Sequence, residues 1–247
     1  MNKFIVTGIP RSGTTIFTKT LAQQSGVDVF SNDHFFYEPF SMGFKNKFRL
    51  NPEKDLAIQE SKCKDDYFGF KAFKDGFLTP DYLMTQGYRP IVLLRKDLWK
   101  SVISAFVQQW QVGQNLHPTY TSKEIIFPDV YNTVEEVPPF MRTRFLINLG
   151  NRVMMCYRAE RVWKDVIDII YFEDLIKPGA TFKNVNEYFQ REIKFDLNYD
   201  NSMDALDYVP GIPREWFTKI TREVIQKLEI ETPDIPQYII DSVNRYL

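Results

Sequence analysis

The first twenty residues constrain the fold of this chain most, because they combine an apolar run, a glycine-bounded loop and a helical pattern. Residues 4–6 are apolar and partly β-branched, which is typical of a buried strand. Residues 8–13 form the loop, and from Thr14 the apolar residues Phe17 and Leu21 recur at helical spacing. In such a unit the N–H groups of the loop and of the first helical turn converge, and the helix dipole adds roughly half a positive charge. The sequence therefore predicts an anion site here, with a plain strand-turn-helix as the alternative.

The loop differs from a Walker A motif at one decisive position. GxxxxGK[ST] needs a lysine after its second glycine to reach the β- and γ-phosphates of a nucleotide. Gly13 is instead followed by Thr14 and Thr15, and the cation of the loop, Arg11, precedes the closing glycine. The loop therefore predicts an anion site that lacks the Walker lysine.

The loop resembles the one with which sulfotransferases hold the 5′-phosphosulfate end of 3′-phosphoadenosine 5′-phosphosulfate (PAPS), P-[KR]-S-G-T-T. The matching residues are Pro10, Arg11, Ser12, Gly13, Thr14 and Thr15. The resemblance implies a PAPS-dependent sulfotransferase in which these residues bind the co-substrate and Arg11 neutralises charge on the leaving phosphate oxygen. We expect no metal, because a monoanionic sulfuryl group carries less charge than a phosphoryl group.

A second resemblance lies after the apolar run at residues 90–94. Sulfotransferases bind the 3′-phosphate of the donor with a basic residue at a strand end and a serine about eight residues later. Lys96 and Ser104 have that spacing, and Arg95 is one residue further from Ser104 than Lys96 is. We nominate Arg95 and Ser104, with Lys96 as a rival cation and Ser101 one turn earlier, because a guanidinium offers a phosphate two parallel hydrogen bonds. A solvated basic cluster is the alternative.

A third resemblance is the run at residues 171–175, which is similar to the [YF]-E-D-L segment of the family. Phe172 is in register with an aromatic residue that contacts the adenine ring in some cytosolic members, while Glu173 and Asp174 suit a structural role equally well. The late Arg-Lys-Gly run that holds the 3′-phosphate in cytosolic members is absent, and Arg214 is a weak substitute.

The reaction needs a base that deprotonates the acceptor hydroxyl. The chain has two histidines, His34 and His117. Glu38 and the proline after it resemble the Glu-Pro of carbohydrate sulfotransferases, and burial among aromatic neighbours would raise the pKa of this carboxyl. We rank Glu38 first, then Asp33 and His34, and His117 last. The resemblance favours a carbohydrate or other small alcohol as acceptor, with phenols and lipids left open.

The main alternative is a P-loop kinase acting on small molecules or polynucleotide ends. Asp33 would then be the base, Thr14 or Thr15 the Mg²⁺ ligand and ATP the donor. The missing Walker lysine argues against it, and so does the strand at residues 91–94, which ends in Arg95 and Lys96 where a Walker B aspartate would stand. A nucleotide-binding module without a base is a further alternative.

Apolar runs alternate with helical patterns along the chain, which favours a P-loop-like, doubly wound parallel sheet flanked by helices in three α/β/α layers. The expected strands are residues 4–6, 27–30, 68–73, 90–94 and 166–171. Residues 41–66 show little periodicity and are interpreted as a flexible acceptor-side segment, and residues 111–139 as a lid.

The length, the net charge and the hydropathy of the chain bear on its domain organisation and its partners. We expect one sulfotransferase-like domain over the 247 residues. A net charge of −1 gives no electrostatic footprint for nucleic acid. No run of 18 apolar residues and no leader pattern is evident, so we expect a cytoplasmic protein without a membrane partner.

Overall fold

The structure of the protein, a computed structural model, describes residues 1–31, 37–40, 51–73, 76–113, 129–163, 168–195, 205–231 and 237–244. The chain divides into two compact units, Met1–Leu94 with Trp163–Tyr199 and Arg95–Val162 with Asp200–Leu247. The first unit carries the sheet, and the described part of the second is mainly helical. A single domain over residues 1–247 stays a prediction.

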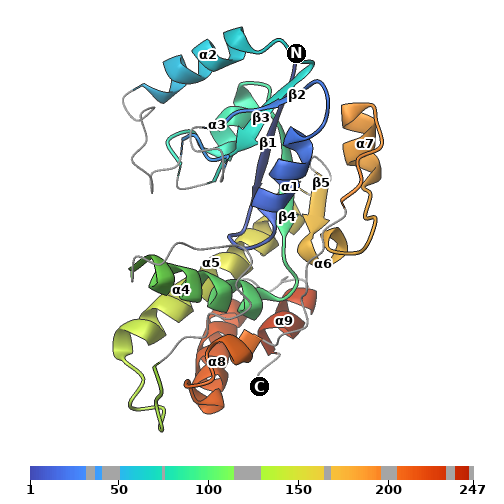
Figure 1. Ribbon diagram of the computed structural model, residues 1–247. Helices are drawn as coiled ribbons and strands as arrows, with labels where there is room; N and C mark the ends of the chain where they lie inside the picture. The colour runs from blue at the N-terminus through green and yellow to red at the C-terminus, as the bar shows by residue number, and fades with distance from the viewer. Residues whose placement is uncertain are drawn as a thin grey trace. The chain divides into compact units, whose positions relative to one another are not determined.

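The first unit is built on a five-stranded parallel sheet with the order β2-β3-β1-β4-β5 (Figure 1). Its strands are β1 Asn2–Gly8, β2 Val27–Val29, β3 Tyr67–Lys71, β4 Arg89–Leu94 and β5 Asp168–Tyr171. β1 lies in the centre, between β3 and β4. From β1 the chain moves to β2 at one edge, whereas β4 leads to β5 at the other edge. Open α/β sheets bind ligands outside the carboxyl ends of their strands at such a reversal, which here is the position of Gly8.

Helices cover both faces of this sheet. One face carries α1 Thr14–Ala22, α6 Phe172–Leu175 and α7 Lys183–Phe189, and the other carries α2 Pro52–Lys62 and α3 Pro80–Thr85. Along β1, Phe4 and Val6 pack into the core beneath α1 and α7, while Ile5 packs into the core beneath α2 and α3. Successive side chains of a strand point to opposite faces, so a fully apolar strand needs cover on both sides. The predicted three-layer α/β/α class is confirmed.

The helix α2 corrects the prediction that residues 41–66 form a flexible segment. Asn51 caps this helix, because its side-chain oxygen accepts a hydrogen bond from the N–H of Lys54 at 3.2 Å, and Pro52 occupies the first turn. Leu56 is its one fully buried residue. A helix that buries so few apolar residues shows little hydrophobic periodicity in its sequence. Residues 41–50 lie outside the described residues.

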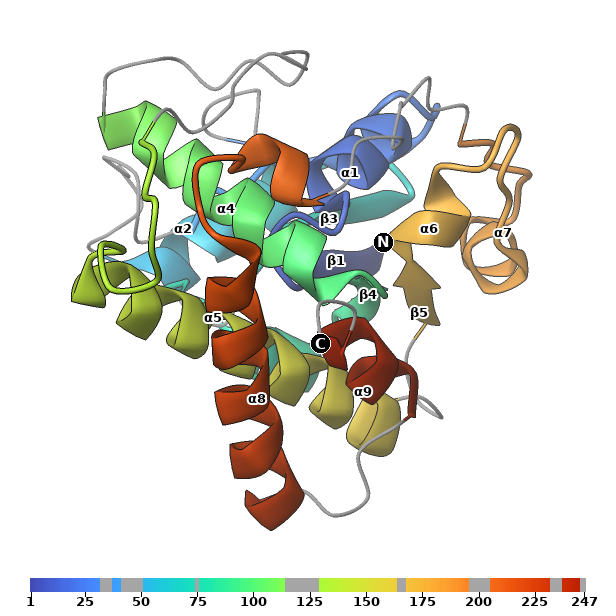
Figure 2. The same ribbon diagram turned by 90° about the horizontal axis from the view of Figure 1, so that it is seen from below.

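In its described residues the second unit contains α4 Leu98–Gly113, α5 Pro139–Arg158, the π-helical turn η1 Ala159–Trp163, the 3-10 turn η2 Ala205–Tyr208, α8 Arg214–Glu231 and α9 Gln237–Asn244. Figure 2 shows α5, α8 and α9 side by side. Aromatic rings form its core: Trp99 meets Phe217 edge-on at 5.4 Å, and Phe145 meets Trp216 at 5.1 Å. Of the predicted lid, residues 114–128 lie outside the described part.

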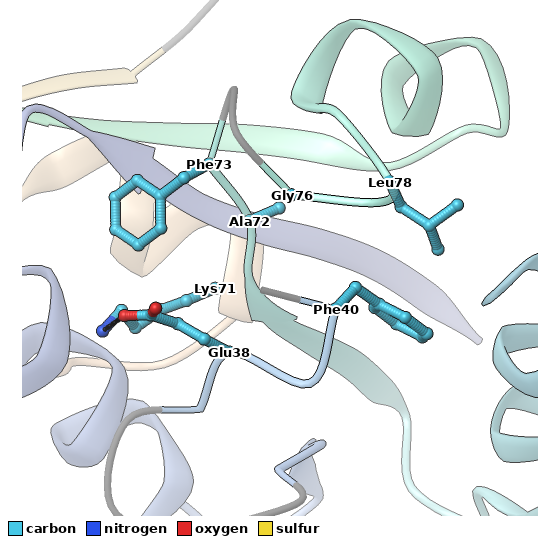
Figure 3. Close-up of a pocket in the computed structure, with 7 residues that line it drawn as sticks. All are labelled: Glu38, Phe40, Lys71, Ala72, Phe73, Gly76 and Leu78. Atoms are coloured by element: carbon cyan, nitrogen blue, oxygen red, sulfur yellow. Dashed lines mark ion pairs between the residues drawn. The ribbon is translucent and has the colours of Figure 1, made fainter. Parts of the chain in front are cut away.

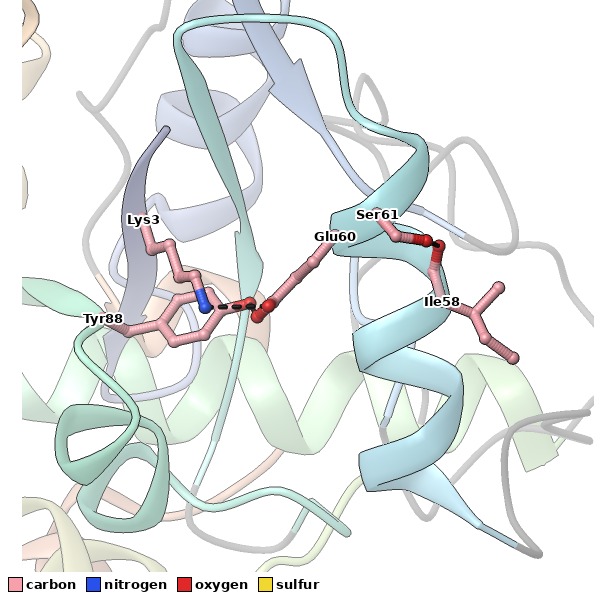
Figure 4. A network of polar contacts seen from close by, with 5 residues as sticks. All are labelled: Lys3, Ile58, Glu60, Ser61 and Tyr88. Atoms are coloured by element: carbon pink, nitrogen blue, oxygen red, sulfur yellow. Dashed lines mark hydrogen bonds and ion pairs between the residues drawn. The ribbon is translucent and has the colours of Figure 1, made fainter.

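A polar network at the amino ends of the strands joins β1, α2 and the start of β4 (Figure 4). Lys3 Nζ lies 2.7 Å from Glu60 Oε2, and the hydroxyl of Tyr88 donates to Glu60 Oε1 at 2.6 Å. Burial, together with the neighbouring Glu60 carboxylate, raises the pKa of Tyr88. The network ties three elements together. No helix in the described parts of the chain is long and apolar enough to cross a bilayer.

Candidate functional site

The loop between β1 and α1 begins with a glycine that no other residue can replace without rearrangement. Gly8 has φ 143°, and a Cβ added there would lie 1.9 Å from the carbonyl oxygen of Leu93 in β4. The N–H of Ile9 donates to that same oxygen at 3.2 Å. The loop therefore leaves the central strand in close contact with its neighbour, which requires the absence of a side chain.

The rest of the loop forms a tight bend that leads into α1. The hydroxyl of Ser12 donates to the carbonyl of Ile9 at 2.7 Å, and both Arg11 (φ 67°) and Gly13 (φ 81°) adopt the left-handed conformation. Gly13 is the N-cap residue of α1, no side chain caps the helix, and its first turn carries no acid. A non-glycine residue in the left-handed region is strained, and such residues cluster at functional sites. The predicted strand, loop and helix are confirmed, while anion binding stays a prediction.

Phe172 lies beneath this loop. Its side chain is 2% exposed, and a Cβ added to Gly13 would lie 2.7 Å from its Cδ2 atom. The ring supports the bend that carries the candidate anion site and belongs to the core beneath α1. The predicted contact of Phe172 with adenine stays a prediction. Asp174 forms a surface ion pair with Lys177 at 2.6 Å, which fits the structural alternative for this segment.

Lys71, the last residue of β3, was not anticipated from the sequence. Its side chain is 1% exposed, and Nζ lies 2.6 Å from the hydroxyl oxygen of Thr15 and 2.6 Å from Glu38 Oε1. Figure 3 shows the side chains of Lys71 and Glu38 pointing toward one another. Its backbone N–H donates to the carbonyl of Tyr37 at 2.8 Å. Lys71 therefore connects the first turn of α1 to the segment that carries the predicted base.

Glu38 lies in the short described segment 37–40. Tyr37 has φ 56°, and the N–H of Phe77 donates to the carbonyl of Phe40 at 2.8 Å, so the segment is held at both ends. The Glu38 side chain is 17% exposed and lines a small pocket (Figure 3). The other lining residues are mainly apolar, namely Phe40, Lys71, Ala72, Phe73, Gly76 and Leu78. Glu38 therefore lies between the ammonium of Lys71 and these apolar walls.

The other candidate bases, Asp33, His34 and His117, lie outside the described residues. Their ranking behind Glu38 therefore stays a prediction from the sequence.

The candidate 3′-phosphate residues belong to the helical unit. Arg95 is buried, Lys96 is exposed and Ser104 is half-buried. Ser101, one turn before Ser104, is fully buried and accepts a hydrogen bond from Nε of Arg152 in α5 at 2.8 Å. Nothing in the local pattern of α5 signals this buried arginine. The roles of Arg95, Lys96 and Ser104 stay predictions, and Arg214 is an exposed residue at the start of α8.

Comparison with known proteins adds no family. No protein-family model matches the sequence, and no curated protein matches it significantly. The class that fold and site define is an α/β protein with a parallel sheet, a glycine-bounded loop before α1 and, beside that loop, an ion pair between a buried lysine and a half-buried glutamate.

Proposed function

We propose that this protein is a sulfotransferase that moves a sulfuryl group from PAPS to a hydroxyl acceptor. One observation carries the proposal. A loop with its own cation, Arg11, leads into an uncapped helix N-terminus, and Lys71 joins the first turn of that helix to the carboxylate of Glu38. An anion site and a base side by side are what transfer of an anionic group to a hydroxyl requires.

In the proposed reaction the acceptor hydroxyl oxygen attacks sulfur as the bond between sulfur and the bridging oxygen breaks. The bridging oxygen remains on the phosphate of 3′-phosphoadenosine 5′-phosphate (PAP), and the Glu38 carboxylate takes the hydroxyl proton. Arg11 and the N–H groups of residues 12–15 stabilise the negative charge that grows on the leaving phosphate. Arg95 or Lys96, with Ser104, keep their predicted role as ligands of the 3′-phosphate.

The surroundings of Glu38 bear on the acceptor. Glu38 and Pro39 resemble the Glu-Pro of carbohydrate sulfotransferases, which favours a sugar or another small alcohol. The pocket beside the carboxylate has apolar walls from Phe40, Phe73 and Leu78. This pocket is small, so the proposed acceptor class rests on the Glu-Pro resemblance.

The contact between Lys71 and Thr15 disfavours the kinase alternative. A kinase would use the hydroxyl of Thr14 or Thr15 as a Mg²⁺ ligand, whereas the Thr15 oxygen accepts from an ammonium at 2.6 Å. Thr14 is 5% exposed. A cation already placed on the Thr15 oxygen would repel a divalent metal there. The same cation supports a site for an anion that needs no metal.

Thermal unfolding with two nucleotides tests the proposal. We expect PAP to raise the unfolding temperature, because a ligand at one hundred times its dissociation constant adds about 2.7 kcal/mol to the free energy of unfolding. Mg-ATP should have little effect, and labelled sulfate should pass from PAPS to some member of an acceptor panel. Stabilisation by Mg-ATP alone would reject the sulfotransferase.

A further inference from the structure

The helix α5 carries an apolar line along its exposed side. Its buried side packs within the helical unit, where α5 contacts α4, α8 and α9. On the opposite side Phe140, Ile147 and Met154 are 65%, 57% and 40% exposed. Seven residues make almost two full turns of a helix, so these three side chains lie in one line. Single exposed apolar residues are common on protein surfaces, whereas three at heptad spacing are typical of a helix that packs against another helix.

A glycine lies beside this line. Gly150 is in the interior of α5, where glycine destabilises a helix relative to alanine. Among the described residues, a Cβ added there would meet no heavy atom within 4 Å apart from its chain neighbours and the backbone of its own helix. The packing of the described residues therefore does not require a glycine here. A second helix lying close to this face would require one, because glycine permits a close approach of the backbone.

The two ends of α5 carry opposite charges. Glu135 and Glu136, both exposed, lie just before the helix, whereas the helix itself has arginines and no acidic residue and ends at the exposed Arg158. If two copies of α5 ran parallel, like charges would meet at each end. An antiparallel pair instead brings the basic end of each helix to the acidic start of the other, and it also opposes the two helix dipoles.

A two-fold axis at Ile147 makes the exposed face complementary to itself. Each residue then lies level with the residue of the other copy that is equally far from Ile147 in the opposite direction. Phe140 lies level with Met154 of the second copy, which places a thioether sulfur near an aromatic ring. Arg144, which is exposed, lies level with Gly150 of the second copy, so the space beside the glycine receives an arginine side chain.

We propose that this face of α5 is the contact between two copies of this chain, which form an antiparallel, two-fold symmetric dimer about Ile147. Symmetric dimers use the same patch on both copies, as this face does. A contact made by one helix face on each copy is small, so the dimer should dissociate on dilution. The inference does not depend on the proposed function, because the dimer needs no nucleotide.

Sedimentation velocity at protein concentrations from about 1 to about 200 μM, the range of weak complexes, tests the proposal. The unmodified protein should pass from one chain to two as its concentration rises. Ile147→Glu places two carboxylates opposite one another on the axis and should weaken the dimer at least about thirtyfold. Gly150→Gln should also weaken it, yet raise the unfolding temperature of the monomer, because glutamine is the better helix former. Ile58→Glu, the same change at an exposed isoleucine of α2, is the matched control and should leave the dimer unchanged.

Disulfide cross-linking tests the direction and register of the two helices. Two cysteines form a disulfide when their Cα atoms lie within about 7 Å. Ile147→Cys should therefore cross-link to its own copy under a mild oxidant, whereas Phe140→Cys should not, because the two copies of residue 140 would lie about 21 Å apart along the pair. Phe140→Cys combined with Met154→Cys should cross-link. The unmodified protein, which contains Cys63 and Cys156, gives the background on a non-reducing gel.

Three results would overturn the inference. A monomer at every concentration leaves this face to another partner or to another segment of the chain. A dimer of full strength in Ile147→Glu places the contact elsewhere. Equal cross-linking of Phe140→Cys and Ile147→Cys excludes the antiparallel pair. If Ile147→Glu does not fold, Ile147→Cys decides alone, and a cross-linked fraction no higher than the background overturns the proposal.

Discussion

Each end of the sheet carries a lysine, a glutamate and a hydroxyl in contact, and the two groups differ in burial. In the carboxyl-end group, Lys71, Glu38 and Thr15, the lysine and glutamate side chains are 1% and 17% exposed. In the amino-end group, Lys3, Glu60 and Tyr88, the corresponding values are 26% and 21%. The two glutamates are thus similarly exposed, and the groups differ in their lysines, because Lys71 is buried and Lys3 is partly exposed.

Burial and backbone strain separate the roles of the two groups. A partly exposed ion pair adds little stability and costs little, so the amino-end group suits a structural tie between elements. At the carboxyl end, the buried ammonium of Lys71 carries a desolvation penalty. The carboxyl-end group also lies beside two strained non-glycine residues, Arg11 and Tyr37. Strain and buried charge together are typical of a functional site, and the amino-end group provides a matched control for each test below.

The largest effect is expected from Arg11→Asn. Asparagine tolerates the left-handed backbone that Arg11 adopts, so the variant should fold and lose only the guanidinium. Loss of one group that stabilises the leaving charge should lower the rate of sulfate transfer about a thousandfold. Arg89→Gln, which removes an arginine stacked on Tyr188 at 4.8 Å at the amino end, should transfer at nearly the normal rate. Equal losses in labelled-sulfate assays would remove the functional distinction between the two ends.

Next in size is the effect of Gly8→Ala on stability. The new Cβ would lie 1.9 Å from the carbonyl oxygen of Leu93, in addition to the strain of a positive φ. We expect a loss of about 3 kcal/mol or more in the free energy of unfolding, measured by urea denaturation. The control is Gly87→Ala, at φ 82° with no atom within 4 Å of the added Cβ, which should cost about 1 kcal/mol from backbone strain alone. Similar losses of stability in the two variants would mean that β4 shifts to accommodate the new Cβ.

Glu38→Gln should lower turnover about a hundredfold and leave PAP affinity intact, because it removes the proton acceptor and retains the shape of the side chain. Glu60→Gln makes the same chemical change in the amino-end group and should leave turnover within about twofold of normal. Steady-state rates of both variants give the comparison. Unchanged turnover in Glu38→Gln would move the base to Asp33 or a histidine.

The smallest effect is expected from Tyr88→Phe. This change removes one hydrogen bond to Glu60 and keeps the contact between Glu60 and Lys3. The free energy of unfolding should fall by about 1 kcal/mol in urea, with no change in transfer rate. A lower transfer rate in the folded variant would show that the amino-end group also serves the reaction.

Local patterns predicted the parts of the fold and site whose contacts are local. The turn and the hydrogen bond between Ser12 and Ile9 lie within the loop itself. The start of α3 is local in the same way, because the Thr79 hydroxyl accepts from the N–H of Tyr82 at 3.3 Å and Pro80 occupies the first turn. The apolar runs of the strands likewise signalled burial on both faces, because each run is continuous in the sequence.

Contacts between residues that are distant in the sequence could not be predicted from local patterns. Lys71 and Thr15 lie 56 residues apart, and in the sequence Lys71 is an ordinary polar residue within the strand expected at residues 68–73. The packing of the Phe172 ring beneath Gly13 is another contact between distant residues, and the adenine role of Phe172 stays a prediction. The structure ends β3 at Lys71 and so brings this residue to the carboxyl end of the strand, where parallel sheets place their ligands.

The segment that carries Glu38 is anchored at both ends by backbone hydrogen bonds, from Lys71 to Tyr37 and from Phe77 to Phe40. Chain that follows such an anchor can gain or lose residues at small entropic cost, because closing a longer loop adds little to the free energy of folding. The two hydrogen bonds therefore hold the carboxylate whatever the length of the chain beyond Phe40. In the proposed sulfotransferase, the base would keep its place while the sequence beyond it varies.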